Sequence, residues 1–67
     1  PNPVKDYLVF SGNLKIKSVE LISYSGQKLS ELILINGKVN LSNLKKGFYI
    51  LKLDTDKGEK TIKIIKD

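Results

Sequence analysis

Hydrophobic and polar residues alternate with a period of two along most of this 67-residue chain. Such a period is typical of half-buried strands, because successive side chains point to opposite faces of a sheet. No segment carries the sustained 3.6-residue period of an amphipathic helix. We therefore expect strands at residues 7–10, 14–17 with 19–21, 29–35, 38–41, 48–54 and 60–66.

Turn residues separate these segments. Asn36-Gly37 is a two-residue hairpin signal, since both positions can take a positive φ. This signal also favours a strand over a helix for residues 29–35, whose composition alone would permit either. Gly58 lies where a second hairpin, at residues 55–58, needs a left-handed residue. Short strands joined by close turns predict a single all-β domain, either an antiparallel sandwich or a small barrel.

The faces of the last two strands follow from the same alternation. Leu51 and Leu53 are expected to face the core together with the ring of Tyr49, whose hydroxyl then needs a partner. In the final strand, Ile62 and Ile64 are expected to share one face, and Ile65 is expected to point the other way with Thr61 and Lys63. Between strands, the loop at residues 42–47 is expected to cross from one sheet to the other, with Gly47 supplying the backbone conformation that starts the next strand.

The composition removes most catalytic and metal chemistry. There is no Cys and no His, so disulfides, thiolate metal clusters and the usual general base are excluded. Serines near lysines remain, but turn and capping roles account for them, and we expect neither catalysis nor a cofactor. Asp54, Asp56 and Gly58 partly match a calcium loop, but Lys57 places a positive charge inside it, and a plain hairpin turn is favoured. The triplet at residues 40–42 is a formal N-glycosylation acceptor that a strand end followed by a turn explains equally well.

The net charge of +5 comes from 12 lysines and no arginine against 7 acidic residues. Nucleic acid is not an expected partner, because base reading favours Arg and stacking platforms need aromatic residues clustered on one strand face. The five aromatic residues here are scattered along the chain. We expect the lysines to keep a small sheet soluble and to prevent edge-to-edge pairing. No apolar run approaches the ~20 residues that span a bilayer, so no stable membrane insertion is expected.

One ordered set of short motifs extends over nearly the whole chain. They are Pro1-Asn2-Pro3-Val4, Val19-Glu20-Leu21, Gly26-Gln27-Lys28, the run from Leu41 to Tyr49, and Lys63-Ile64-Ile65-Lys66. In this order and at this spacing the chain resembles the type A carboxy-terminal sorting domain of the Bacteroidetes type IX secretion system.

This resemblance implies an immunoglobulin-like β-sandwich of about seven short strands. Residues 1–67 would then be a single C-terminal sorting domain excised from a larger secreted protein, acting as an address and not as a catalyst. The implied partners are the type IX translocon, a surface sortase that removes the domain near or before Pro1, and a cargo domain linked on the amino-terminal side. The implied location is secreted or cell surface, reached through the periplasm and the outer membrane.

The family's functional residues are carried over by position. Pro1, Asn2 and Pro3 match its opening motif, Gly26 its central glycine turn, Gly47 and Tyr49 its Gly-x-Tyr strand start, and Lys63 and Lys66 its basic last strand, which the export machinery is implied to read. The chain departs from the family pattern at Asp67 and at Phe48, which is larger than usual there and is expected on the outer face or at the sandwich edge. A basic last strand at a sheet edge also suits recognition by β-strand addition, and replacing Lys63 and Lys66 by Glu is expected to leave the fold intact.

A second class of function stays open. The alternative is an immunoglobulin-like accessory module that binds carbohydrate or spaces the catalytic domain of an extracellular enzyme. Such modules usually carry an exposed aromatic platform or a calcium site, and neither is evident in the sequence.

Overall fold

The computed structural model describes residues 4–10, 12 and 15–67, and these residues form seven strands and no helix. The strands are β1 (Tyr7–Val9), β2 (Ile16–Ser23), β3 (Lys28–Leu32), β4 (Leu34–Ile35), β5 (Lys38–Asn40), β6 (Gly47–Thr55) and β7 (Gly58–Lys66). Within this described part, no helix is long and apolar enough to cross a membrane.

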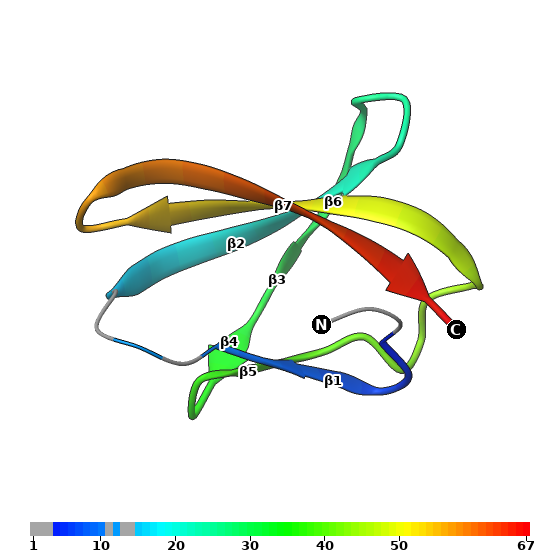
Figure 1. Cartoon of the computed structure of the whole chain (residues 1–67), viewed down its shortest axis with the longest axis horizontal. Coiled ribbons are helices and arrows are strands. Elements are labelled where there is room, and N and C mark those ends of the chain that lie inside the picture. Colours follow the sequence, from blue (N-terminus) through cyan, green and yellow to red (C-terminus); the bar gives the residue numbers. More distant parts are fainter. Residues whose placement is uncertain (1–3, 11, 13–14) are drawn as a thin grey trace.

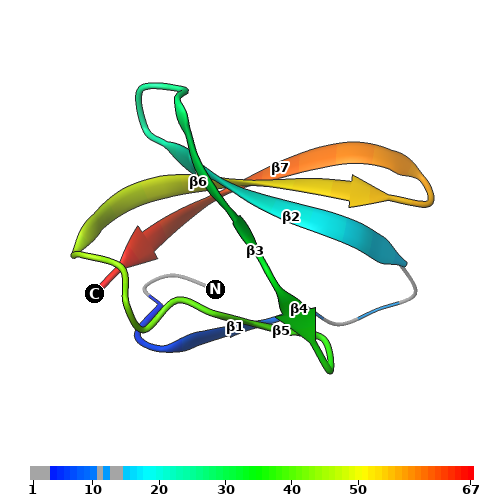
Figure 2. The ribbon, with the colours of Figure 1, turned by 180° about the vertical axis from the view of Figure 1, so that it is seen from behind.

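The strands form two antiparallel sheets that pack as layers (Figure 1). One sheet has the order β3-β2-β6-β7, and the other has the order β1-β5-β4. Seen from behind, the chain leaves the four-stranded sheet along β3 and enters the three-stranded sheet at β4 (Figure 2). The predicted all-β sandwich of about seven strands is therefore confirmed.

A single strand was predicted at residues 29–35, but the structure has two strands there, β3 and β4, which belong to different sheets. Leu32 and Leu34 both pack against the core, one from each sheet, while Ile33 between them is 76% exposed. Since residues two apart point the same way along an extended chain, the apolar alternation continues unbroken through the corner. The prediction of one strand was wrong, because nothing in that pattern marks a change of hydrogen-bonding partner.

The core lies between the two sheets. Its buried members are Val4, Leu8, Val19, Leu21, Val39, Leu41, Leu51, Leu53 and Ile64. The predicted core face of β6 is confirmed, since Leu51 and Leu53 are buried and Tyr49 is partly buried beside them. Ile62 and Ile64 share a face of β7 as predicted, and the structure turns this face toward the core. The alternation therefore assigns the inner face of β6 and the shared face of β7 correctly.

The predicted turns are also present. Asn36 and Gly37 have φ values of 52° and 75°, which suit the two-residue hairpin between β4 and β5. Gly58 has a φ of 101° in the β6–β7 turn, as expected for a residue in the left-handed half of backbone space. These turns set the register of the strands that carry the surface described below.

Candidate recognition surface

Gly47 and Tyr49 shape the start of β6. Gly47 has a φ of 151°, a region that is essentially restricted to glycine. Two residues later, the Tyr49 hydroxyl donates a hydrogen bond of 2.8 Å to the main-chain oxygen of Lys45. This bond ties the crossing loop to β6 in the manner of the tyrosine corner of immunoglobulin-like domains, and it supplies the partner that the sequence required. Both motif residues therefore stabilise the loop that leads into β6.

Gly26 lies in the turn between β2 and β3. Its φ is 97°, and its amide donates to the main-chain oxygen of Ser23 at 2.9 Å. The Ser23 hydroxyl oxygen accepts a bond of 3.0 Å from the amide of Gln27. Gly26 thus closes a hairpin, as its position in the motif predicts. Pro1, Asn2 and Pro3, the remaining motif residues of the amino end, lie outside the described residues.

Lys63 and Lys66 point to opposite sides of β7. Lys66 shares the parity of Ile64, is only 8% exposed, and lies directly across the ladder from Gly47, which has no side chain to occupy that place. Its Nζ donates to the main-chain oxygen of Asp67 at 3.3 Å. Replacing Lys66 by Glu would put a shorter carboxylate in this buried position, so the paired replacement is unsuitable as a test that preserves the fold.

Lys63 is exposed on the outer face of the four-stranded sheet. The free edge of β7 is covered at its carboxyl end by the backbone of Val4. The amide of Val4 donates to the Ile65 oxygen at 2.7 Å, and the amide of Asp67 donates to the Val4 oxygen at 2.8 Å. In an antiparallel ladder, alternate residues direct their backbone groups to the same side, so Glu59 and Thr61 also present theirs to the edge. Among the described residues no strand other than β6 pairs with β7 near Thr61, where a partner strand could be added, and Val4 blocks such pairing at the carboxyl end of β7.

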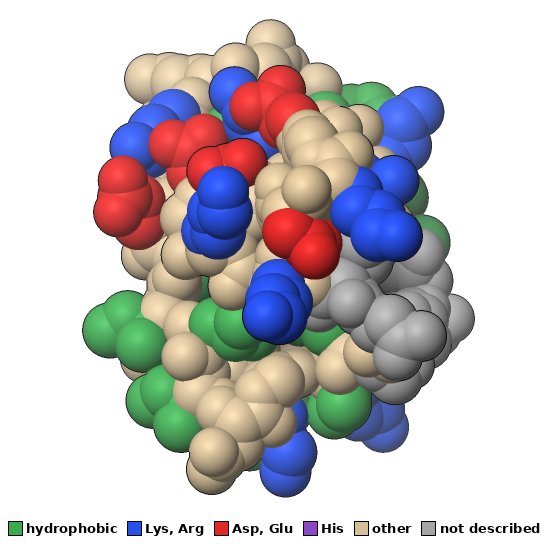
Figure 3. Space-filling view, turned by 90° about the vertical axis from the view of Figure 1, so that its left-hand side faces the viewer, with side chains coloured by type: hydrophobic (Ala, Val, Ile, Leu, Met, Phe, Trp, Pro, Cys, Tyr) green, Lys and Arg blue, Asp and Glu red, His purple; other side chains and the backbone are tan. Residues whose placement is uncertain are grey.

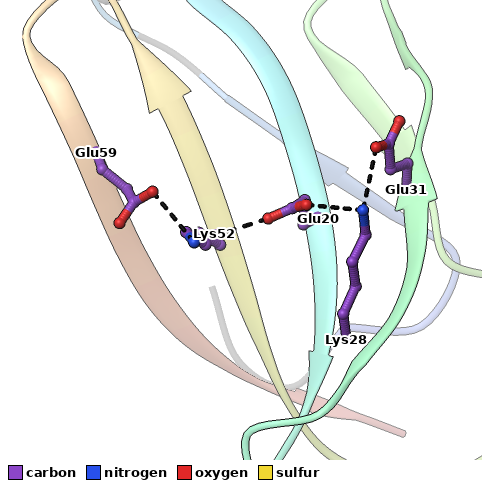
Figure 4. A network of polar contacts seen from close by, with 5 residues as sticks. All are labelled: Glu20, Lys28, Glu31, Lys52 and Glu59. Carbon is purple, nitrogen blue, oxygen red and sulfur yellow. Dashed lines mark hydrogen bonds and ion pairs between the residues drawn. The ribbon is translucent and has the colours of Figure 1, made fainter.

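A row of charged side chains crosses all four strands on the outer face of this sheet (Figure 4). Lys28 Nζ lies 2.9 Å from a carboxylate oxygen of Glu20 and 3.1 Å from one of Glu31. Lys52 Nζ lies 3.2 Å from Glu59 and 3.9 Å from Glu20. Glu20 and Glu31 are directly opposite in the β2–β3 register, so Lys28 offsets a repulsion between like charges.

The pKa of Glu20, the central carboxylate of this charged row, is shifted by its lysine neighbours. The hydrogen bond from Lys28, together with the positive charges of Lys28 and Lys52, lowers the pKa of Glu20 below its ordinary value. The hydrogen bonds to Glu20 and Glu31 raise the pKa of Lys28 above its ordinary value. Both pKa changes favour the charged forms of Glu20 and Lys28, as expected for an ion pair held together by a hydrogen bond.

An apolar hollow lies on the same outer face, beside the end of β7. Its lining residues are Tyr24, Phe48, Lys63, Ile64 and Ile65, its volume is about 210 Å³, and we call it the aromatic pocket. The rings of Tyr24 and Phe48 lie 5.6 Å apart at 51°. Phe48 is 59% exposed and stands directly opposite Ile65 in the ladder, so its expected place on the outer face is confirmed. The sequence did not indicate this pocket, because Tyr24 belongs to a different hairpin.

A second, wider hollow lies on the outer face of the three-stranded sheet. It has a volume of about 470 Å³ and is lined by Tyr7, Ile33, Ile35, Asn36, Lys38 and Asn40. From the side, acidic and basic side chains are interleaved over the upper, four-stranded part of the molecule, and hydrophobic side chains gather lower down (Figure 3). On this side of the molecule, the acidic side chains therefore lie over the four-stranded sheet.

Asp56 of the β6–β7 turn stabilises the fold through two hydrogen bonds to Lys15. The amide of Asp56 donates to the Lys15 oxygen at 3.0 Å, and the amide of Lys15 donates to the Asp56 carboxylate at 3.2 Å. Among the described residues, no group of three or more His, Cys, Asp or Glu side chains could hold a metal ion. In the glycosylation triplet, the Asn40 side-chain oxygen accepts bonds from the amide and hydroxyl of Ser42, which forms the expected turn.

Two packed antiparallel sheets with a tyrosine corner define an immunoglobulin-like sandwich, an architecture shared by many cell-surface domains. The family model described as the secretion system C-terminal sorting domain matches residues 1–67, the whole chain. The chain therefore belongs to this family of type IX secretion sorting domains. No curated protein and no solved structure matches it.

Proposed function

We propose that this chain is the carboxy-terminal address of a larger secreted protein and directs a cargo, linked on its amino-terminal side, through the type IX outer-membrane translocon. The observation that carries the proposal is the match of the sorting-domain family to every residue of the chain. The fold supports it, since seven short strands enclose one core and leave β7 at the edge of a sheet. The route proposed is through the periplasm and the outer membrane to the cell surface or the medium.

A surface sortase is proposed to remove the domain after transport, at a bond near or before Pro1. The domain itself is proposed to be non-catalytic and to need no cofactor, in keeping with a chain that has neither His nor Cys. Its task is to fold and to present a surface that the translocon binds. Of the two basic motif residues of β7, Lys63 is proposed to contact the translocon directly, which its exposed position supports, whereas Lys66 is buried. Gly26, Gly47 and Tyr49 are proposed to act indirectly, by holding the turns and loop that shape this surface.

A reporter fusion tests the proposal. Residues 1–67 are attached to the carboxyl end of an enzyme carrying an amino-terminal signal peptide, and the fusion is expressed in a bacterium with a type IX system and in an isogenic strain lacking its outer-membrane translocon. We expect reporter activity outside the first strain and confined to the periplasm of the second. Equal release from both strains, or retention in both, would contradict the proposal.

A shorter fusion without residues 61–67 provides a secondary comparison. It removes Lys63, but it also removes the buried Ile64 from the core. Loss of export in that fusion reports on the fold as well as on the address, so it requires a parallel measurement of folding. Normal export of this truncated fusion would refute a role for the last strand.

Carbohydrate binding is the second candidate function. It is favoured by one observation, the hollow of about 470 Å³ on the three-stranded sheet, which lies within the usual size range of ligand sites. Tyr7 is the aromatic side chain among the lining residues that could stack on a sugar ring. A polysaccharide pull-down comparing the wild type with Tyr7→Ala separates the two functions, because an export address predicts no retention of either protein.

A further inference from the structure

The aromatic pocket adjoins the strand that carries the proposed address. Phe48 and Ile65 face each other across the β6–β7 ladder, and Tyr24 reaches them from the β2–β3 turn. All three are large hydrophobic residues that stay substantially exposed in the folded domain. They form a continuous apolar surface on the outer face of the four-stranded sheet.

The size of the pocket limits what it can hold. A volume of about 210 Å³ lies below the range of roughly 300–1,000 Å³ that is usual for small-molecule sites. One aromatic or branched aliphatic side chain is of a suitable size, and two aromatic rings with a branched aliphatic neighbour are typical of the centres of protein interfaces. The pocket is therefore better suited to a protein side chain than to a metabolite.

The charges around the pocket are mainly positive. Lys63 lies on its wall, and Lys45 and Lys46 are exposed in the loop that leads into β6 and Phe48, whereas Lys66 is buried on the opposite side of β7. On the other part of the same sheet face, the glutamates of the charged row are paired with Lys28 and Lys52. A partner with carboxylates beside its apolar anchor would complement the pocket and its surroundings.

The closed edge of β7 favours binding to the face of the sheet. Val4 already bonds the backbone at Ile65 and Asp67, so a partner strand could pair there only after displacing it. A side chain entering the aromatic pocket from the outer face displaces none of these bonds. Docking on the face therefore reaches the end of β7 at a lower cost than strand addition does.

We propose that the aromatic pocket is the docking point for an acidic segment of a partner protein. The segment inserts one aromatic or branched apolar side chain against Tyr24 and Phe48, and its carboxylates lie near Lys63. This proposal rests on the function proposed above, since the partner is then a protein of the export machinery.

The test uses the reporter fusion with substitutions on the two exposed apolar surfaces. Phe48→Ser and Tyr24→Ser change the aromatic pocket, and Ile33→Ser and Ile35→Ser are matched controls on the three-stranded sheet. All four side chains are more than half exposed, so thermal unfolding of the isolated domain is expected to change little. We expect about a tenfold or greater fall in the export rate for the pocket variants, as for truncated interface anchors, and no change for the controls.

A charge reversal gives a second, independent readout. Lys63→Glu places a negative charge on the pocket wall, and Lys60→Glu does the same at an exposed position of the same strand that does not line the pocket. We expect the Lys63 variant to reduce export and the Lys60 variant to export normally. Equal effects of the two reversals would contradict an acidic segment at the pocket.

The outcomes separate this proposal from the function on which it rests. If the wild-type fusion is not exported, the proposed function itself fails. If the wild type is exported and Phe48→Ser is exported equally well, the docking proposal fails and the function stands. If Thr61→Pro, which alters the open part of the β7 edge, blocks export while the pocket variants do not, strand addition replaces docking on the face.

Discussion

Replacing Gly47 by Ala separates a backbone role from a recognition role for this motif residue. At a φ of 151°, a residue with a Cβ pays a conformational strain of about 1–3 kcal/mol. Steric overlap adds little, because the new Cβ would lie 3.9 Å from Tyr49 Cε2, an ordinary van der Waals contact. The expected destabilisation therefore comes from the backbone alone.

The effect should be large for a domain of this size. In domains of 60–100 residues, 1 kcal/mol corresponds to a shift of about 4–8 °C in Tm, so a strain of about 2 kcal/mol lowers Tm by about 8–16 °C. Circular dichroism of the isolated domain during heating and in urea measures both quantities. Lys46→Ala, at the exposed neighbouring position, is the matched control and is expected to stay within about 0.5 kcal/mol of the wild type.

The refuting result for Gly47 is equally clear. If the free energy of unfolding of Gly47→Ala lies within about 0.5 kcal/mol of the wild-type value, the strain argument is wrong. A loss of export by such a stable variant would then assign Gly47 a direct contact with the translocon. If instead stability falls as calculated, Gly47 belongs to the family motif because it starts β6.

Two further predictions concern side chains. Tyr49→Phe removes the hydroxyl that bonds the main-chain oxygen of Lys45 and should lower the free energy of unfolding by about 1 kcal/mol, as measured by urea titration; an unchanged urea midpoint would contradict the tyrosine-corner role. The lowered pKa of Glu20 means that its ionised form stabilises the fold above its ordinary pKa and that this contribution is lost as the pH falls through the folded-state value. The difference in free energy of unfolding between the wild type and Glu20→Gln, measured by urea titration, should consequently be constant near neutral pH and shrink in acid. A difference that does not vary with pH would contradict a stabilising role for the ionised Glu20.

The strands and turns were largely predictable, because they depend on local chemistry. The period of two marks the inner face of β6 and groups Ile62 with Ile64 on one face of β7, and Asn36-Gly37 marks a hairpin by its tolerance of positive φ. The sheet change at Ile33 could not be predicted, since the choice between two hydrogen-bonding neighbours is made by packing and leaves the alternation intact. The local sequence pattern therefore predicts where strands and turns lie better than it predicts which strands pair with one another.

The surface was less predictable than the fold. The burial of Lys66 could have been foreseen from its parity with Ile62 and Ile64, but a lysine is normally expected to be exposed. The meeting of Tyr24 with Phe48 had no local signal, because it depends on how far the β2–β3 hairpin extends beside β6. The charged row likewise depends on the register of four strands.

The most direct test of the account is the distribution of the reporter fused to residues 1–67 in cells with and without the type IX outer-membrane translocon. The measured quantity is the fraction of reporter activity outside the cell envelope. The account predicts a high fraction in the competent strain and retention in the periplasm of the deficient strain. The same fraction in both strains would contradict it.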